Sequence, residues 1–471
     1  MATAANATQP ANGISNQLAT FAYSLRYEDI PERVRERAKH LILDSVGIAH
    51  ASGTYHFATV ALQAADILGD QGDCPVIGQK RKLSVRDAAL VNGILCHGLD
   101  FDDTHSAGVI HATTSVFPAA LAAAHRANAS GKELLTAYVV GVEVAARLGM
   151  VVKGGLHQIG FHPTGVFGAF ACALVAGRLM GLDETQLAMA QGIVLSMASG
   201  SLEFLEDGAW TKRMHPGWAA SAGITAAALA KAGYIGASRP YEGRFGFYNA
   251  YLNNKELREK CDLGLATADL KSVWEIENVA IKPFPACHFT HGCIDAAVKL
   301  AKKHPIKLAD IKRVRALIPQ GVVKTVAEPV ANKRRPRSEY DAEFSIPFTV
   351  SASLLRGQFT LKELTDEALA DPDILALADR VDYEIDTQSG FPRYYSGEVV
   401  VELKDGRELR QREDINRGNA ERPISNGEIA VKYEDNIKVA GATQRGGKVR
   451  ETILGLDRAN SARDVAQLLS V

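Results

Sequence analysis

The sequence of 471 residues lacks the features typical of secreted, membrane and nucleic-acid-binding proteins. Its six cysteines form no Cys-x-x-Cys pair and no regular spacing, which argues against a disulfide framework and a structural zinc site. The 53 lysines and arginines nearly balance the 54 aspartates and glutamates, so no overall charge would attract nucleic acid or an anionic membrane. We therefore expect a cytoplasmic protein with neither a nucleic-acid nor a membrane partner.

Several motifs are also missing. We find no glycine-rich dinucleotide fingerprint, P-loop, Gly-x-Ser-x-Gly or His-Glu-x-x-His, which disfavours NAD-dependent redox chemistry, phosphoryl transfer and serine hydrolysis. The most apolar windows, such as Val166 to Leu179, are too short to span a membrane. Residues 1–16 lack the pattern of a signal or transit peptide and are predicted to form a disordered tail.

A helical period dominates the first half of the chain. Apolar residues return at three- and four-residue steps, as at Val34, Ala38 and Leu41, and Ser84 with Asp87 resembles a capping box. Many inward positions are Ala or Gly, which lets helix axes approach closely. Besides the helix that begins at Ser84, helices are predicted over residues 116–126, 132–148, 164–180, 184–197 and 217–232.

Strand-like segments follow, and then the helical period returns over 428–469, where the chain is expected to pack back onto the first helices. The fold class is mainly α. The expected division is a large helical domain, 17–267 plus 418–471, and a smaller α+β domain, 268–417. Strands are predicted at 278–282, 311–318, 381–386 and 398–403, a hairpin turn at Asp405-Gly406, and helices at 290–303 and 344–356.

The densest polar cluster runs from Asp100 through Asp102, Asp103, Thr104 and His105 to His111. It could be a solvated acidic loop, since Asp and Thr are common turn formers. Carboxylates beside imidazoles also suit a divalent metal or acid/base catalysis. No His-x-x-x-His pair fixes a metal geometry, so the residues alone leave the three readings open.

Two further segments place cationic or imidazole side chains at expected helix starts. His162-Pro163 follows a glycine-rich loop, and Lys212, Arg213 and His215 precede Pro216-Gly217. Unpaired N–H groups and the helix dipole favour anions at such ends, although each is also an ordinary helix start. Together they indicate a multiply charged acid as the ligand.

Lys282 lies in a mainly apolar segment stiffened by Pro283 and Pro285, which would also present His288. The alternative is a lysine with its head group in water. Cys287 and His288 are adjacent, and adjacent strand residues point to opposite faces, which disfavours a Cys–His nucleophile.

In these segments the chain resembles the MmgE/PrpD family almost from end to end. The matching motifs are Asn92-Gly93 with His97, Leu99 to Thr104 with His111, Phe161 to Thr164, Lys212 with His215, Phe245 to Tyr248 and Ile281 to Ala286. The resemblance implies a helical domain built from both chain ends, a smaller α+β lid, and a cleft between them that needs no metal or other cofactor. It also implies a homodimer. The site residues it implies are Asp100, Thr104, His111, His162, Lys212 and Lys282.

The resemblance implies a lyase that acts on a small hydroxy di- or tricarboxylate by proton abstraction next to a carboxylate. Lys212 and Lys282 would hold carboxylates and stabilise an enolate, and His111 and His162 would transfer protons. Asp100 would orient one histidine. Because these side chains are expected to be exposed in a cleft, they should contribute little to the stability of the folded chain. Substrate contacts are expected from Thr104, Asp103, His105, Arg213, His215 and His288.

Dehydration of a 2-methylcitrate-like acid is the reaction we expect first. Epimerisation of a dicarboxylate such as iminodisuccinate and decarboxylation of the cis-aconitate type are the alternatives, and a non-catalytic carboxylate-binding protein is a third. A metal-dependent hydrolase is the last alternative. Two departures from the family pattern count against a decarboxylase: His105 stands where a tryptophan is expected, and residues 318–331 lack a tyrosine. His105 also counts against strict specificity for 2-methylcitrate.

Overall fold

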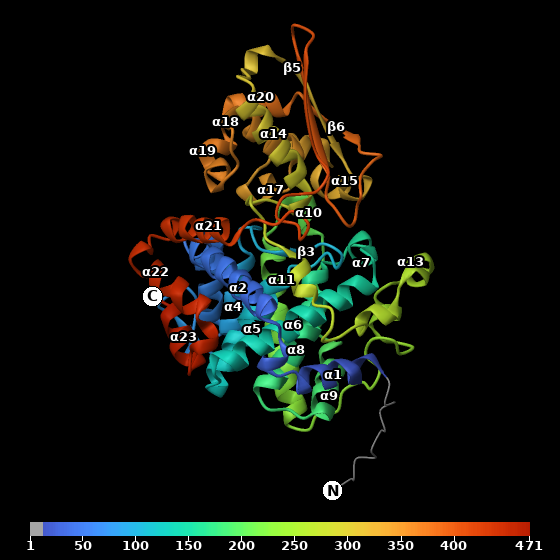
Figure 1. Cartoon of the computed structure of the whole chain (residues 1–471), viewed down its shortest axis with the longest axis vertical. Helices are drawn as coiled ribbons and strands as arrows, with labels where there is room; N and C mark the ends of the chain where they lie inside the picture. The colour runs from blue at the N-terminus through green and yellow to red at the C-terminus, as the bar shows by residue number, and fades with distance from the viewer. Residues whose placement is uncertain (1–12) are drawn as a thin grey trace.

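Two groups of hydrophobic side chains form separate cores in the computed structural model, which describes residues 13–471. The larger core uses residues from Ile14 to Ile281 and again from Ile424 to Leu469. The smaller part of the chain, which lies above it in Figure 1, has its own buried clusters between Phe284 and Leu403, joined by Leu202 and Phe204. The buried residues of the larger core thus extend past residue 267, where the first domain was expected to end, to Ile281.

The mainly α prediction is confirmed. Residues 1–12 of the predicted tail lie outside the described residues, but Ile14 to Asn16 are not a tail, because they begin the first helix. The longer helices of the first core are α1 (Ile14–Ser24), α2 (Glu32–Ser52), α3 (His56–Ile67), α4 (Val85–His97), α5 (Thr113–Ala127), α6 (Gly131–Val151), α8 (Pro163–Leu179), α9 (Glu184–Val194), α11 (Thr211–Lys231), α21 (Asn426–Val439), α22 (Thr443–Leu454) and α23 (Ala462–Leu469). Short helices α7 (Gly155–Gln158), α10 (Phe204–Asp207), α12 (Phe247–Ala250) and α13 (Lys255–Lys260) lie between them.

Glycines let α4 and α11 cross closely, and this crossing positions the site. A Cβ added to Gly93 would lie 2.4 Å from the Cα of Gly217, so neither helix could stay in place with a larger residue there. The C-terminal end of α4 is thereby held beside the N-terminal end of α11. Ser84 does cap α4 by accepting from the Asp87 N–H, but the Ser84 N–H donates to Asp70, so the predicted capping box is not closed.

The start of α11 differs from the prediction. The helix begins at Thr211 rather than at Gly217, and Pro216 lies inside it. Lys212, Arg213 and His215 therefore project from helical turns instead of from a preceding loop.

Helix α6 is long and apolar enough to cross a membrane by length and composition. In the fold it lies inside the larger core, with 94% of its apolar window buried, and packs against α8 and α5. Burial on every side explains its composition, because a helix surrounded by protein has no polar face.

The smaller part contains a four-stranded sheet in the order β6-β5-β7-β8, in which β5 pairs parallel with β6 and antiparallel with β7. The predicted strands and hairpin exist as β5 (Ile311–Ile318), β6 (Val381–Ile385), β7 (Gly397–Leu403) and β8 (Glu408–Glu413). Its helices are α14 (His291–Lys303), α15 (Val323–Val326), α16 (Val330–Arg334), α17 (Glu339–Ala342), α18 (Ile346–Arg356), α19 (Asp366–Leu369) and α20 (Pro372–Ala378).

The predicted strand at 278–282 is present but does not join this sheet. It is the two-residue strand β4 (Val279–Ala280), and it pairs with β3 (Thr104–His105) of the first core. Two other short strands, β1 (Cys74–Pro75) and β2 (Lys82–Leu83), also pair with each other. The β3–β4 pair brings Thr104 close to the segment that carries Lys282.

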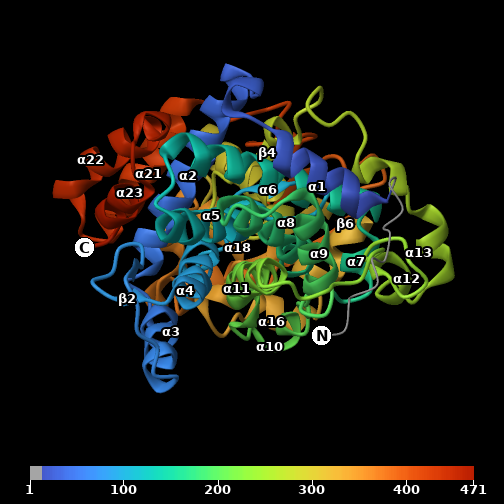
Figure 2. The same ribbon diagram turned by 90° about the horizontal axis from the view of Figure 1, so that it is seen from below.

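The last three helices return to the first core, as Figures 1 and 2 show. Helix α21 packs along α2, where a Cβ on Gly47 would lie 2.9 Å from the ring of Tyr433. The buried Lys432 of α21 donates to Asp44 of α2 and, at 2.7 Å, to the carbonyl oxygen of Phe101. The C-terminal segment thus supports the loop that follows α4.

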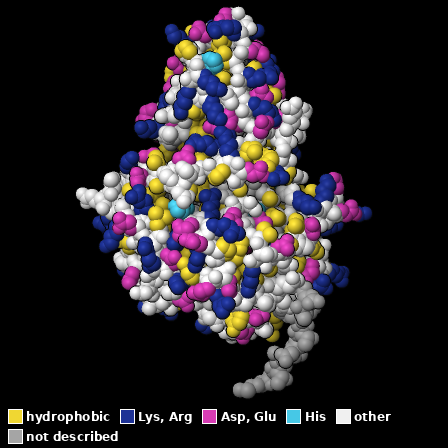
Figure 3. All heavy atoms as spheres, viewed as in Figure 1, with side chains coloured by type: hydrophobic (Ala, Val, Ile, Leu, Met, Phe, Trp, Pro, Cys, Tyr) yellow, Lys and Arg dark blue, Asp and Glu magenta, His cyan; other side chains and the backbone are white. Residues whose placement is uncertain are grey.

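Positive and negative side chains are interspersed over the face in Figure 3, as the balanced composition leads one to expect. A bound anion must then be attracted by a local group of cations. The cavity between the two cores contains such a group.

Candidate active site

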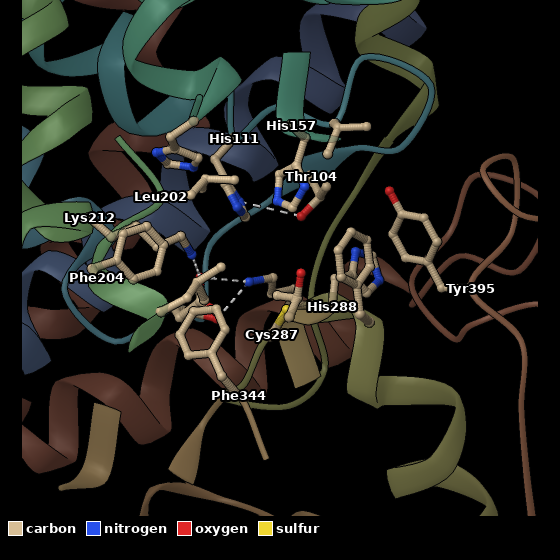
Figure 4. A pocket seen from close by; sticks show the side chains of 17 residues that line it. Thr104, His111, His157, Leu202, Phe204, Lys212, Cys287, His288, Phe344 and Tyr395 are labelled. Carbon is tan, nitrogen blue, oxygen red and sulfur yellow. Dashed lines mark hydrogen bonds and ion pairs between the residues drawn. The ribbon is translucent and has the colours of Figure 1, made fainter. Parts of the chain in front are cut away.

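A cavity lies where the two cores meet. Both cores contribute walls, and most of the lining groups are buried (Figure 4). Its polar lining comes from Asp100, Thr104, His111, His157, His162, Lys212, Lys282, Cys287, His288, Thr325 and Tyr395, and its apolar lining includes Val109, Leu202, Phe204, Phe289 and Phe344.

Asp100 joins two lysines from different parts of the chain. Its Oδ1 atom accepts from Lys212 Nζ at 2.5 Å and from Lys282 Nζ at 3.1 Å, while its carbonyl oxygen accepts from Lys282 at 2.7 Å. Asp100 has a positive φ of 42°, a region that non-glycine residues rarely adopt and that recurs at functional sites. The turn after α4 thus aims both the carboxylate and its own carbonyl oxygen at ammonium groups.

The charges of this group support one another. Burial opposes ionisation of Asp100, but Lys212 and Lys282 outweigh it and hold the pKa of the carboxyl well below its usual range. Burial likewise opposes the charge of Lys282, yet Asp100 and Asp102 outweigh it and raise the lysine pKa. Two ammonium groups on one carboxylate leave one net positive charge, which suits a carboxylate ligand in a site shielded from water.

Asp102 orients two imidazoles. Its Oδ2 atom lies 2.9 Å from His97 Nδ1 and 3.0 Å from His111 Nδ1. The carbonyl oxygen of Asp103 lies 2.7 Å from the same His111 nitrogen. The Thr104 hydroxyl lies farther away, at 3.4 Å. Because the Asp102 carboxylate and the Asp103 carbonyl can only accept hydrogen bonds, His111 Nδ1 carries a proton, and Nε2 is left for proton exchange with a ligand.

Burial sets the protonation of the remaining imidazoles. It lowers the pKa of His97 to about 4 and that of His162 well below its usual value, so both rings are neutral near pH 7. His162 caps α8, and its Nδ1 lies 3.0 Å from Nδ1 of His215. The rings of His97 and His162 stack with centroids 5.7 Å apart, which keeps His162 beside His111.

The structure brings together seven of the predicted site residues in one cavity: Asp100, Thr104, His111, His162, Lys212, Lys282 and His288. The expectation that such groups are exposed is wrong, since Lys282 is fully buried and His162 is 3% exposed. The predicted role of Asp100 is also wrong, because its side chain binds lysines, and Asp102 orients His111.

Four predicted substrate contacts do not line the cavity. Asp103 accepts from the Thr113 N–H, and His215 lies behind His162. Arg213 donates to the Gly98 carbonyl and packs 4.0 Å from the centre of the Tyr340 ring. These side chains support the site from behind and do not contact its interior.

His105 is the fourth predicted substrate contact that does not line the cavity. It follows Thr104 on β3, and successive strand residues point to opposite faces, so Thr104 faces the cavity while His105 points away. Its Nε2 lies 3.1 Å from Glu275, and its Nδ1 accepts from the Gly108 N–H. Because His105 does not line the cavity, its difference from the expected tryptophan does not change the cavity's chemistry.

Several lining residues were missed by the sequence reasoning. His157, Phe204, Phe344 and Tyr395 are scattered over four segments with no shared motif, and only the three-dimensional packing brings them together. Tyr395 supplies a phenol from outside residues 318–331, where a tyrosine was expected. Its hydroxyl donates to the Ser106 carbonyl at 3.3 Å.

Some of these histidines could also approach a metal ion. Nitrogens of His97, His111 and His162 lie within 4.8 Å of one another among the described residues. A second set of this kind contains His97, Asp100 and Asp102. The lysine–aspartate group offers an anion site built from hydrogen bonds that are already present.

The sequence is similar to known proteins over most of its length. The profile of the MmgE/PrpD N-terminal domain matches residues 16–260, and that of the C-terminal domain matches residues 284–457. The human cis-aconitate decarboxylase is 30% identical over 439 residues, which cover 90% of this chain and 87% of that one. An Aspergillus terreus cis-aconitate decarboxylase is 27% identical over 98% of this chain and 96% of its own. A 2-methylcitrate dehydratase of Cupriavidus necator is 23% identical over 76% and 75%.

Proposed function

The chain belongs to the MmgE/PrpD family, and on that premise we propose that it is a lyase that removes CO2 from a small unsaturated tricarboxylate such as cis-aconitate. The observation that carries the proposal is the cavity in which Lys212 and Lys282 share Asp100 beside the Asp102-bound His111. The decarboxylase relatives, which align over nearly the whole chain, favour this reaction over the dehydration expected from the sequence.

Substrate binding begins with the two lysines. A carboxylate of the substrate takes hydrogen bonds from Lys212 and Lys282, whose remaining N–H groups are available because each ammonium has three donors. Asp100 keeps the two ammonium groups together before the substrate arrives, so little reorganisation is needed during the reaction. The aromatic wall of Phe204 and Phe344 shields this contact from water.

The proposed reaction balances in two steps. The C–C bond to the departing carboxylate breaks, CO2 leaves, and the electron pair moves through the C=C bond to the carbon next to another carboxylate. The lysines stabilise the resulting dienolate. His111, doubly protonated, then delivers the proton on Nε2 to that carbon, while Asp102 retains Nδ1 and offsets the charge.

Dehydration of a hydroxy tricarboxylate is the second candidate, supported by the dehydratases among the relatives. Here neutral His111 takes the proton from the carbon next to the lysine-bound carboxylate through Nε2 and returns it to the departing hydroxyl, which leaves as water. The same side chains serve both reactions, with His111 starting from the opposite protonation state.

The test is a panel of acids in D2O followed by NMR. Cis-aconitate, citrate, 2-methylcitrate and iminodisuccinate would report CO2 loss, water loss and deuterium exchange with inversion as different spectra. CO2 loss from cis-aconitate supports the proposal. Water loss alone would favour dehydration, exchange with inversion would favour an epimerase, and calorimetric binding without turnover would favour a non-catalytic carboxylate-binding protein.

We also propose that the chain forms a homodimer. One face of α11 carries large side chains at four-residue steps: Trp210, just before the first helical residue, then Met214 and Trp218. Each of these side chains is about 40% exposed. Light scattering should give twice the chain mass for the wild type and a smaller mass for Trp218→Glu. A wild-type monomer would refute this part alone.

A further inference from the structure

A chain of hydrogen bonds fixes the tautomer of His288. The backbone N–H of Tyr395 donates to Asn416 Oδ1 at 3.0 Å, which fixes the orientation of the Asn416 amide. Nδ2 of that amide lies 2.7 Å from His288 Nε2. An amide nitrogen can only donate, so His288 Nε2 must accept, and the proton of the neutral ring is on Nδ1.

The Nδ1–H group has no hydrogen-bond acceptor among the residues that the structure describes. His288 is 3% exposed, and burial keeps its pKa well below the usual value, so the ring is neutral. His291 packs against it with centroids 4.7 Å apart, but no hydrogen bond joins the two rings in the described structure. His291 Nε2 donates to the Ala286 carbonyl, and its Nδ1 also lacks a partner there. A buried donor without a partner is rare in native proteins and points to a missing acceptor.

The position of His288 indicates which acceptor that is. His288 and Tyr395 lie on the right of the cavity in Figure 4, whereas Lys212 lies on the left. A substrate with one carboxylate on the lysines therefore directs its other end toward His288. A neutral N–H in a buried wall binds a carboxylate oxygen without adding a third cation to the site.

We propose that His288 donates from Nδ1 to a second carboxylate of the substrate and that Asn416 is the positioning residue that keeps it a donor. The proposal rests on the proposed function only in taking the ligand to be a polycarboxylate. It makes His288 a specificity-determining residue, since an acid without the second carboxylate would leave this N–H unpaired.

The first measurement is ¹⁵N NMR of the wild-type protein labelled at histidine, with His288 assigned by its loss in His288→Leu. We expect a protonated Nδ1 and an unprotonated Nε2. The reverse tautomer, or a doubly protonated ring, would overturn the proposal whatever the enzyme's reaction is.

The second measurement is calorimetric binding of tricarballylate, a saturated tricarboxylate that needs no turnover. We expect His288→Leu to raise Kd about ten- to a hundredfold, as for loss of a hydrogen bond to a charged group. His288→Asn, which keeps an N–H donor near the Nδ1 position, should recover part of the affinity. Asn416→Ala should also weaken binding, because the Nε2 tautomer becomes accessible.

Asn419→Ala is the matched control, since Asn419 lies in the same segment and bonds the Glu421 N–H instead of a histidine. It should bind tricarballylate like the wild type. Where turnover is measurable, His288→Leu should raise KM with kcat within about threefold. Equal Kd values for wild type, His288→Leu and Asn416→Ala would refute the inference, whereas failure of the wild type to turn over any acid would refute only the proposed reaction.

Discussion

Replacement of Asp102 by Asn exchanges one carboxylate oxygen for an NH2 group and removes the negative charge beside His111. The carboxylate accepts from both His97 and His111, and these interactions hold its pKa well below the usual range against the effect of burial. An asparagine offers one acceptor atom and one donor group. Both imidazoles face the same oxygen of Asp102, so the asparagine oxygen at that place still accepts from both rings but carries no charge. Its NH2 group then takes the place of Oδ1, which has no hydrogen-bond partner among the described residues.

The expected loss follows from the lost charge. The neutral amide no longer offsets the charge of the doubly protonated His111 that delivers the proton, although the Asp103 carbonyl still accepts from Nδ1. The same change in a Ser-His-Asp triad lowers kcat about 10⁴-fold, and general acid–base catalysis contributes about 10²–10⁴-fold. We expect kcat to fall about 10²–10⁴-fold. Stability should fall by about 1–3 kcal/mol for one unpaired buried donor.

The assay compares kcat, KM and urea unfolding of Asp102→Asn with those of Asp103→Asn. Asp103 is the neighbouring buried carboxyl, but its side chain accepts from the Thr113 N–H and contacts no imidazole. The control should retain kcat within about threefold. If Asp102→Asn also does so while folded, the assignment of Asp102 as the group that orients His111 is refuted.

Three further predictions concern charge, pH and metal. Lys282→Met should abolish turnover and also lower the unfolding temperature, because Lys282 is fully buried on Asp100; a fully active variant would exclude the lysine pair as the anion site. Burial raises the folded pKa of Asp103 to about 7, above the unfolded value near 3.9, so its proton is held more tightly when folded and stability is lost as the pH rises from about 4 to 7. The stability of Asp103→Asn relative to the wild type should therefore increase from pH 5 to pH 8 in urea titrations; equal differences at both pH values would contradict this sign. Turnover should persist after dialysis against EDTA, and loss restored by zinc would instead assign His97, His111 and His162 to a metal.

Local patterns in the sequence were sufficient for most of the fold. The helical period predicted α5, α6 and α8 to within a few residues, and the alternation of apolar and polar residues predicted both ends of β5. Both patterns can be recognised from residues that are close together in the sequence. The predicted start of α11 was wrong because proline is common at the first position of a helix, so Pro216 was taken to mark that position. In the structure, Pro216 lies in the second turn of the helix.

The site was predictable where its residues follow one another in motifs. Lys212 and Lys282 were recognised, but their common partner Asp100 could not be deduced, since that contact depends on the close crossing of α4 and α11 at Gly93 and Gly217. In β3 the side chains of Thr104 and His105 point to opposite faces of the strand. A strand of two residues is too short for its buried face to be predicted from a sequence pattern.

The most direct test of the proposed function is the product that the wild-type protein forms from cis-aconitate in D2O, followed by NMR with CO2 release measured in parallel. The account predicts one CO2 released per molecule of product and one deuterium on the carbon that receives the proton. The same mixture with Lys282→Met should show neither. Formation of a hydrated acid without CO2, or no reaction with cis-aconitate, would contradict the proposed decarboxylation.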